Sequence, residues 1–267
     1  MVTNELVSSV LALAQRAGDA IMTIYDRGDA TVTEKDDRSP LTEADLASHR
    51  VIVAGLAQIA SSGGPTIPVL SEEARAMPYD VRRTWQRFWL VDPLDGTKEF
   101  IKRNGEFTVN IALVENGAPV LGVVHAPVLG HTYFATAAGG AFRRDGDTVR
   151  RISVAARAPT IEIVASRSHG SAETSECLKR FEADHAIHLV AIGSSLKLCL
   201  VAEGVAHLYP RFGPTMEWDT AAAQCIVEAA GGRVTDLEGH PLIYNKENLL
   251  NPQFVVAAPE LEWRGYL

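Results

Sequence analysis

The sequence contains little cysteine and no long apolar run, and each scarcity argues against a class of protein. The three cysteines form no C-x-x-C pair, which fits a reducing cytosol better than a disulfide framework, so we expect buried or helix-face thiols. No run approaches the ~18 apolar residues that a membrane span requires. Residues 1–22 lack a basic leader and carry apolar side chains at helical spacing, which predicts an amphipathic helix rather than a signal peptide. We therefore expect a soluble, cytoplasmic protein.

Basic residues are outnumbered as well, since 25 Lys and Arg against 33 Asp and Glu give a formal net charge of -8. This balance argues against a nucleic-acid polymer as partner, because such binders usually carry a basic face. It leaves room for a small phosphorylated ligand. The sequence also lacks a P-loop, an H-E-x-x-H motif and a G-x-S-x-G elbow, so those three site types are not indicated.

Local patterns predict two halves that meet near residue 155. Residues 1–155 indicate an α+β domain with an antiparallel sheet, including a hairpin that turns at Asn116-Gly117. Residues 156–267 alternate strand and helix, as α/β folds do: strands are expected at 160–166, 187–193 and 205–210, and helices at 171–184, 195–204 and 218–230. Neither a low-complexity linker nor an internal repeat separates the halves.

Four groups of acidic residues follow strands or begin helices. They are Asp45 near the start of an expected helix at about 46–60, the paired glutamates at Glu72, the pair Asp92 and Asp95, and Asp219 before an alanine-rich helix. Each has a simpler explanation: Asp219 as an N-cap, Asp95 as a turn residue, Glu72 as part of a solvated loop, and Asp45 as a helix-start acid. The joint pattern is harder to explain that way, because three of the four groups lie where an apolar strand ends or a helix begins.

A cation would be needed if these acids converge. Two like charges ~4 Å apart repel by roughly 4 kcal/mol at an effective dielectric near 20, and several such pairs would exceed a typical net stability of ~5–15 kcal/mol. Carboxylates without a nearby His or Cys cluster suit Mg²⁺ or Mn²⁺ better than zinc. The acidic pattern therefore favours a hard divalent cation.

Three motifs resemble the lithium-sensitive, magnesium-dependent phosphatases of the inositol monophosphatase superfamily. They are L-S-E-E at residue 70, D-P-L-D-G-T at residue 92 and W-D-T-A-A-A at residue 218, in that order. Further stretches, among them S-R-S-H, G-S-S-L-K-L-C-L-V-A-E-G and L-Y-P-R-F-G-P-T, resemble the bacterial 3'(2'),5'-bisphosphate nucleotidases within it. The similarity runs from the first helix to about residue 254. It implies a layered α-β-α-β-α sandwich, with residues 1–155 supplying most metal ligands and residues 156–267 completing the substrate pocket.

The resemblance also implies a role for each acid. The expected metal ligands are Glu72, Asp92, the backbone carbonyl of Leu94, Asp95 and Asp219, holding two to three Mg²⁺ ions for which Mn²⁺ could substitute. Asp45 and Thr97, with Glu72, would orient and help to deprotonate a metal-bound water. Gly96 and Thr97 would offer backbone N–H groups to the phosphate.

The implied reaction is hydrolysis of adenosine 3',5'-bisphosphate to AMP and phosphate. The second phosphate or the ribose needs a pocket away from the metals, for which the candidates are Arg167, Ser168, His169, Gly193, Ser194, Ser195 and Lys197, with Asp219 also near the substrate. A polar loop accounts equally well for the stretch around His169. Inositol monophosphatase activity, fructose 1,6-bisphosphatase activity and a non-catalytic metal- or nucleotide-binding module stay open. So do the oligomeric state and a loose attachment to the inner membrane.

Overall fold

The fold is built on two β-sheets, and the computed structural model describes residues 2–34, 40–61, 66–156, 158–166 and 172–267. The larger sheet has seven strands in the order β3-β4-β5-β6-β7-β8-β9. Its strands are β3 (Val69–Ser71), β4 (Arg87–Asp95), β5 (Thr108–Glu115), β6 (Ala118–Ala126), β7 (His131–Thr136), β8 (Gly140–Asp145) and β9 (Thr148–Ile152). Strand β3 runs parallel to β4, whereas every later neighbour is antiparallel. The antiparallel sheet expected in the first half of the chain is thereby found.

The smaller sheet has five strands in the order β11-β10-β12-β14-β13. Its strands are β10 (Thr160–Ser166), β11 (Ala186–Ile192), β12 (Leu208–Arg211), β13 (Arg233–Asp236) and β14 (Phe254–Ala257). Strand β10 is parallel to β11 and β12, and β14 pairs antiparallel with β12 and β13. A two-stranded hairpin, β1 (Val32–Glu34) and β2 (Pro40–Thr42), lies apart from both sheets.

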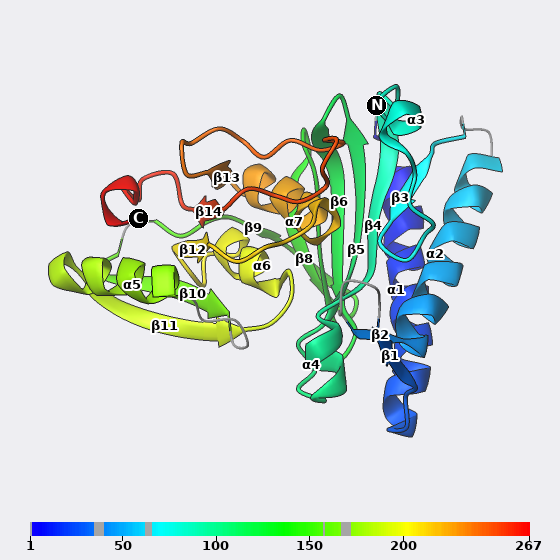
Figure 1. Ribbon diagram of the computed structural model, residues 1–267, viewed down its shortest axis with the longest axis horizontal. Helices are drawn as coiled ribbons and strands as arrows, with labels where there is room; N and C mark the ends of the chain where they lie inside the picture. Colours follow the sequence, from blue (N-terminus) through cyan, green and yellow to red (C-terminus); the bar gives the residue numbers. More distant parts are fainter. Residues whose placement is uncertain (1, 35–39, 62–65, 157, 167–171) are drawn as a thin grey trace.

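Helices cover both faces of the larger sheet, so the predicted layered α-β-α-β-α architecture is confirmed (Figure 1). Helices α1 (Asn4–Arg27) and α2 (Glu43–Ser61) pack on one face, and α7 (Glu217–Ala229) packs on the other. Helix α6 (Leu196–Ala202) contacts both α7 and the smaller sheet, and α5 (Ala172–Asp184) lies beside β11. The short elements are α3 (Tyr79–Arg82), α4 (Thr97–Ile101) and the 3₁₀ turn Arg264–Tyr266.

The middle of strand β4, from Phe88 to Val91, is apolar at four consecutive positions because both of its faces are covered. Phe88 and Leu90 join the core shared with α6 and α7, while Trp89 and Val91 point into the core under α1 and α2. A strand covered on both faces needs apolar residues at every position rather than at alternate ones. The core that contains Phe88 draws side chains from both sides of residue 155. The domain boundary at that residue stays a prediction.

Several local predictions are confirmed. The β5–β6 hairpin turns at Asn116 and Gly117, whose φ angles of 51° and 79° are those that a tight hairpin turn requires. The three cysteines, Cys177, Cys199 and Cys225, are free thiols and buried. Among the described residues, no helix combines the length and apolar character needed to cross a bilayer. Arg167, Ser168 and His169 lie outside the described residues.

Gly122 determines how closely α7 approaches the larger sheet. A Cβ on this β6 residue would lie 2.1 Å from the carbonyl oxygen of Ala222 in α7. We expect Gly122→Ala to displace α7 and to lower the free energy of unfolding by about 1–3 kcal/mol, as overpacking typically does. Chemical denaturation measures this. Gly265→Ala is the control, because a methyl group there meets no atom within 4 Å; equal stability of the two variants would contradict the role given to Gly122.

Candidate metal centre and cavity

Parallel pairing of β3 and β4 brings two acidic groups to one edge of the sheet. Glu72 directly follows β3, and Asp92 lies near the end of β4. Asp219 reaches the same place from the first turn of α7. Carboxylate oxygens of Glu72, Asp92 and Asp219 all lie within 4.8 Å of one another, which is close enough to share a metal ion. The predicted convergence of these three acids is therefore found, although they come from distant parts of the chain.

The turn after Asp92 is held by local hydrogen bonds. The backbone N–H of Leu94 donates to Oδ1 of Asp92 at 3.0 Å, and the hydroxyl of Ser48 donates to the Pro93 carbonyl at 2.7 Å. The register of β4 against β5 shifts between Asp92 and Asp95. Such a bulge re-aims side chains at the end of a strand. Here Asp92 lies against Glu72 and Asp219, while Asp95 lines the cavity.

Asp45 combines a helix-start role with a contact to the centre. Its Oδ2 accepts the backbone N–H of Thr42 at 2.8 Å and the Thr42 hydroxyl at 2.6 Å, and that hydroxyl in turn lies 3.1 Å from the N–H of Ala44. This capping explains why α2 begins at Glu43, a few residues before the expected start near 46. The Thr97 hydroxyl lies 3.2 Å from Asp45 Oδ1 and 3.4 Å from the Leu94 carbonyl oxygen. The two residues expected to act as a pair are thus in contact.

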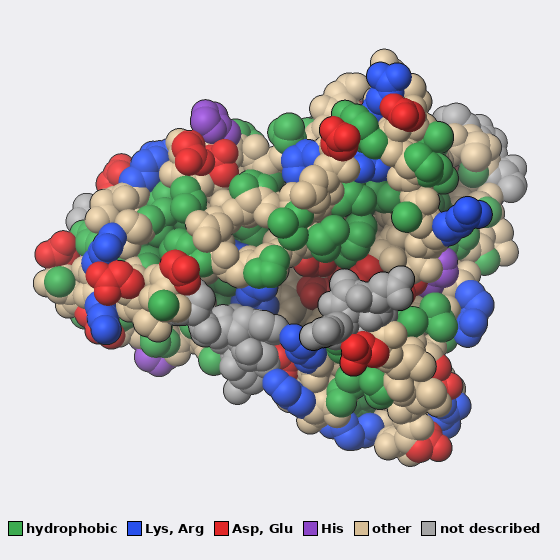
Figure 2. All heavy atoms as spheres, in the orientation of Figure 1, with side chains coloured by type: hydrophobic (Ala, Val, Ile, Leu, Met, Phe, Trp, Pro, Cys, Tyr) green, Lys and Arg blue, Asp and Glu red, His purple; other side chains and the backbone are tan. Residues whose placement is uncertain are grey.

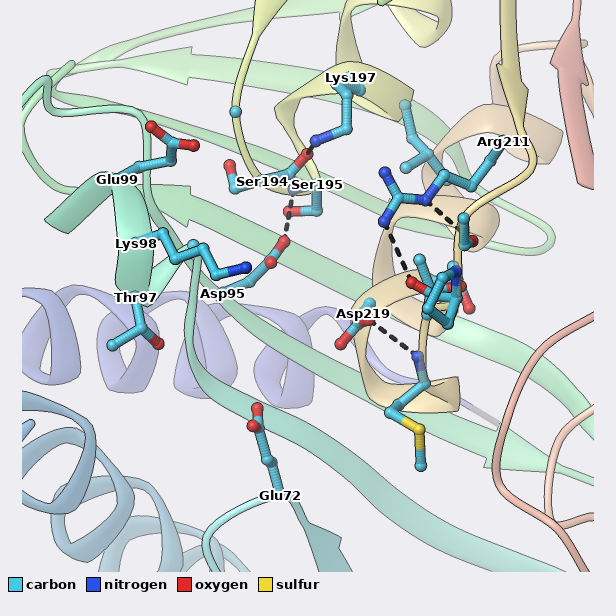
Figure 3. Close-up of a pocket in the computed structure, with 18 of the residues that line it drawn as sticks. Glu72, Asp95, Thr97, Lys98, Glu99, Ser194, Ser195, Lys197, Arg211 and Asp219 are labelled. Atoms are coloured by element: carbon cyan, nitrogen blue, oxygen red, sulfur yellow. Dashed lines mark hydrogen bonds between the residues drawn. The ribbon is translucent and has the colours of Figure 1, made fainter. Parts of the chain in front are cut away.

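Asp219 differs from one expectation, because it is not the N-cap of its helix. The helix starts at Glu217 after the extended residue Met216, which pairs with Leu250 in an isolated β-bridge. Asp219 is consequently the third helical residue, and its Oδ2 accepts the Met216 N–H at 2.8 Å. Asp219 still satisfies an N-terminal amide of the helix. Its carboxylate also faces the cavity (Figure 3).

Asp95 is oriented by residues from two other elements. Its Oδ2 accepts the backbone N–H of Ser195 at 2.5 Å and lies 3.5 Å from Nδ2 of Asn110 on β5. The Ser195 hydroxyl donates to Oδ1 of Asn110 at 2.8 Å and lies 2.8 Å from the Thr108 hydroxyl. Ser195 was expected to donate to the substrate, yet its hydroxyl is engaged inside the protein. Sequence reasoning missed Asn110, a buried polar residue in a largely apolar strand.

The buried acids repel one another in the absence of a counter-charge. Burial raises the pKa of Asp92 well above its usual range, and the charges of Glu72 and Asp95 raise it further. The pKa of Asp219 is raised well above its usual range by burial and then by Asp95 and Glu72. Burial also raises the pKa of Asp95, although Lys197 opposes this shift. A divalent cation among oxygen ligands would relieve the repulsion, so these residues fit a metal site.

Glu72, Asp95 and Asp219 line a cavity of about 750 Å³. Figure 2 shows acidic side chains inside the hollow near the centre of the molecule. Lys197 and Arg211 line the cavity away from Glu72 (Figure 3), and Lys98 also contributes to the wall. Apolar lining comes from Tyr209, Met216, Leu250 and Phe254 among others. Such a cavity can bind a molecule that carries two anionic groups and an apolar body.

Two cations line the cavity on the side away from Glu72. Nζ of Lys197 donates to the Ser194 carbonyl at 2.7 Å and lies 5.7 Å from the ring centre of Tyr209. Burial lowers the pKa of Lys197 to about 8, with Asp95 acting in the opposite direction. Arg211 donates to the carbonyls of Gly213 and Pro214, each at 3.1 Å. The sequence analysis noted the L-Y-P-R-F-G-P-T stretch but assigned Arg211 no role. The position of Arg211 at the end of a strand could have indicated one.

Comparison with known proteins places the chain in a family. The profile of the inositol monophosphatase family matches residues 3–263. This chain belongs to that family. Over 254 residues it is 52% identical to the 3'(2'),5'-bisphosphate nucleotidase CysQ of Shigella flexneri, covering 94% of this chain and 99% of that protein.

Solved structures agree with this assignment. A crystal structure of CysQ from Bacteroides thetaiotaomicron is 46% identical and superimposes with a TM-score of 0.84, covering 96% of this chain and 97% of that one. The extragenic suppressor protein suhB from Bartonella henselae is 26% identical with a TM-score of 0.78, covering 96% and 95%. Both similarities extend over nearly the full length of the chain.

The metal centre generates a prediction about stability. Because the folded-state pKa of Asp92 lies above the unfolded value of about 4, the metal-free protein should lose stability as pH rises through the range between the two. Asp92→Asn removes one repelling charge, so at pH 7 without metal it should melt above the wild type. Each ~1 kcal/mol of relieved repulsion should raise Tm by about 2–4 °C.

Differential scanning calorimetry with EDTA and with MgCl₂ tests this prediction. Mg²⁺ should raise the Tm of the wild type much more than that of Asp92→Asn. Glu228→Gln is a suitable control, because burial raises the pKa of Glu228 without a neighbouring carboxylate among the causes. An equal Mg²⁺ response in the wild type and Asp92→Asn would rule out Asp92 as a metal ligand.

Proposed function

We propose that this protein is a Mg²⁺-dependent 3'(2'),5'-bisphosphate nucleotidase that hydrolyses adenosine 3',5'-bisphosphate to AMP and phosphate. The observation that carries the proposal is one cavity whose wall holds converging carboxylates together with the cations Lys197 and Arg211, which lie away from Glu72 (Figure 3). A substrate with two phosphates matches that charge distribution. The names of the relatives above support the same activity.

The metal ligands in this proposal are the side chains of Glu72, Asp92, Asp95 and Asp219 and the carbonyl of Leu94. Oxygen ligands alone favour Mg²⁺, in two to three sites, with Mn²⁺ as a substitute. When bound, the ions activate a water for attack and stabilise the leaving oxygen of the ester. No Ser, Cys or His nucleophile motif is needed for this reaction.

The chain's own contribution to proton transfer centres on Thr97. Its hydroxyl lies within hydrogen-bonding distance of Asp45 Oδ1, so donation of that proton leaves the Thr97 oxygen able to accept one from a water. Glu72 is a second carboxylate placed to assist. Thr97 also begins α4, after Gly96 in a left-handed conformation with φ of 93°. The leading amides of such a turn have no partner within the helix and are suited to phosphate.

The second phosphate is assigned to the cationic end. Lys197 and Arg211 supply charge, and the segment Gly193, Ser194 and Ser195 forms the adjoining wall. We keep Ser194 as a substrate contact and assign Ser195 the task of orienting Asp95. Arg167, Ser168 and His169 stay predictions, because they lie outside the described residues. A loose attachment to the membrane also stays a prediction.

Two variants test the metal ligands. Asp95→Asn and Asp219→Asn should reduce turnover by more than the roughly 10–100-fold that loss of a residue supporting a metal ligand costs. Both should fold normally, because an asparagine oxygen can still accept the N–H of Ser195 or Met216. Phosphate release and circular dichroism are the measurements. Near-normal turnover in either variant would refute its assignment.

Substrate class is tested by comparing phosphate release from adenosine 3',5'-bisphosphate, inositol monophosphate and fructose 1,6-bisphosphate at equal Mg²⁺. We expect the nucleotide to have the highest kcat/KM. A higher kcat/KM for inositol monophosphate or fructose 1,6-bisphosphate would reassign the substrate. Release from none of the three would favour a non-catalytic binding module.

Lys197 predicts a pH dependence of substrate binding. Its pKa of about 8 means that the amine loses its proton, and with it the attraction for a phosphate, as the pH rises above that value. The KM for the bisphosphate should therefore rise above pH 8, by up to about tenfold per pH unit if binding requires the proton. Lys197→Arg retains its charge and should give a flatter profile between pH 7 and 9. Parallel profiles for the two proteins would remove Lys197 from the phosphate site.

A further inference from the structure

Glu217 is a fully buried acid next to the metal centre whose contacts the mechanism above does not use. Its side chain has no exposed surface, and its Oε2 accepts the backbone N–H of Asn245 at 2.6 Å. Its Oε1 accepts the backbone N–H of Lys246 at 3.0 Å and the Lys246 ammonium at 2.6 Å. Burying the charge of Glu217 costs desolvation energy that the attraction to the partly exposed Lys246 often fails to recover. Net stability is therefore a weak explanation for it.

The partners of Glu217 belong to one segment, residues 244–251, which we call the bracing loop. Beyond the side-chain contacts, Glu217 N–H donates to the Leu249 carbonyl at 2.9 Å. Nδ2 of Asn251 donates to the Met216 carbonyl at 2.8 Å and to the Thr220 hydroxyl at 3.0 Å. The bracing loop thus contacts residues of the first turn of α7 that come before and after Asp219 in the sequence. It is the Met216 N–H in this turn that orients the Asp219 carboxylate.

The bracing loop is fixed at its other side by Arg82, which is itself buried. Arg82 donates to Oδ1 of Asn245 at 3.0 Å and to the Glu247 carbonyl at 2.7 Å. Arg82 belongs to α3, ten residues beyond Glu72. The loop therefore connects the chain that follows one metal ligand to the helix turn that carries another.

The same loop shapes the cavity. Leu250 and Met216 face each other in a β-bridge, and both line the cavity beside Asp219. A shift of the bracing loop would move this apolar wall together with the first turn of α7. The position of the Asp219 carboxylate and the position of the apolar wall therefore both depend on the contacts of one buried carboxylate, Glu217.

We propose that Glu217, through its pairing with Lys246, is a positioning residue that sets the Asp219 carboxylate for metal and the Met216–Leu250 wall for substrate. The part concerning substrate rests on the proposed nucleotidase function. The part concerning metal does not, because it can be measured by metal binding alone.

The test variant is Glu217→Gln, which keeps the shape of the side chain. The amide turns one acceptor into a donor and so opposes the donors of Asn245 and Lys246. We expect the affinity for Mg²⁺, measured by isothermal titration calorimetry without substrate, to fall roughly 10–100-fold, as for other residues that support metal ligands. In assays, saturating Mg²⁺ should restore most of kcat, while the KM for adenosine 3',5'-bisphosphate stays raised.

Glu203→Gln is the matched control. Glu203 is another buried carboxylate, paired with Arg143 at 2.9 Å and Arg150 at 2.7 Å, at the end of α6 away from the metal ligands. It should lower Tm without changing the affinity for Mg²⁺. If Glu217→Gln also lowers Tm but leaves Mg²⁺ affinity unchanged, Glu217 is merely structural and the proposal is wrong. An unchanged KM would overturn the substrate part alone.

A double variant separates pairing from loss of a single charge. Lys246→Met leaves the Glu217 carboxylate buried without its cation, whereas Glu217→Gln with Lys246→Met removes both charges. We expect the double variant to bind Mg²⁺ no more weakly than the weaker single variant; additive losses would contradict a joint role.

A wild type that binds Mg²⁺ but releases no phosphate refutes the nucleotidase function only. A wild type that binds no Mg²⁺ refutes the positioning claim as well.

Discussion

Repulsion among buried carboxylates is the constraint around which this structure is organised. Glu72, Asp92 and Asp219 have oxygens within 4.8 Å of one another, and Asp95 adds to the charge felt by Asp92 and Asp219. At such separations each pair costs about 4 kcal/mol at an effective dielectric near 20, a sizeable share of a typical net stability of ~5–15 kcal/mol. The rest of the fold has to hold these groups together until cations offset their charge.

Backbone amides provide much of that restraint. Four of the acids each accept an N–H from a nearby or contacting segment, namely Asp45 from Thr42, Asp92 from Leu94, Asp95 from Ser195 and Asp219 from Met216. Hydrogen bonds to one oxygen favour the ionised form and fix the direction of the other. The carboxylates are thereby pre-oriented by the main chain, which cannot rotate away as a side chain can.

Local sequence predicted the features that local chemistry determines. The apolar strand that ends at Asp92, the hairpin at Asn116-Gly117 and the alternating second half follow from patterns over a few residues. The residues that were missed act over long separations. Asn110 meets Ser195, 85 positions further along the chain, and Arg211 acts on the charge of Asp95 from the other half of the chain.

The same distinction explains the differences at Asp219 and Ser195. An alanine-rich helix after Asp219 indicates an N-cap, but the bridge from Met216 to Leu250 accompanies an N-cap three residues earlier, at Met216. Serines before a lysine suggest substrate donors, yet the contact with Thr108 and Asn110 turns one of them inward. In both cases tertiary pairing overrides a correct local propensity.

The two ends of the cavity are coupled through the short segment from Ser194 to Lys197. Asp95 accepts the Ser195 N–H, while Lys197 donates to the Ser194 carbonyl and feels the charge of Asp95. A cation bound at Asp95 removes the negative charge that helps Lys197 to keep its proton, and an anion beside Lys197 restores it. The charges at each end of the cavity are thus best compensated when an ion of opposite sign also occupies the other end. A ligand whose two anionic groups span the cavity satisfies both conditions at once, whereas a ligand with one phosphate satisfies only one of them.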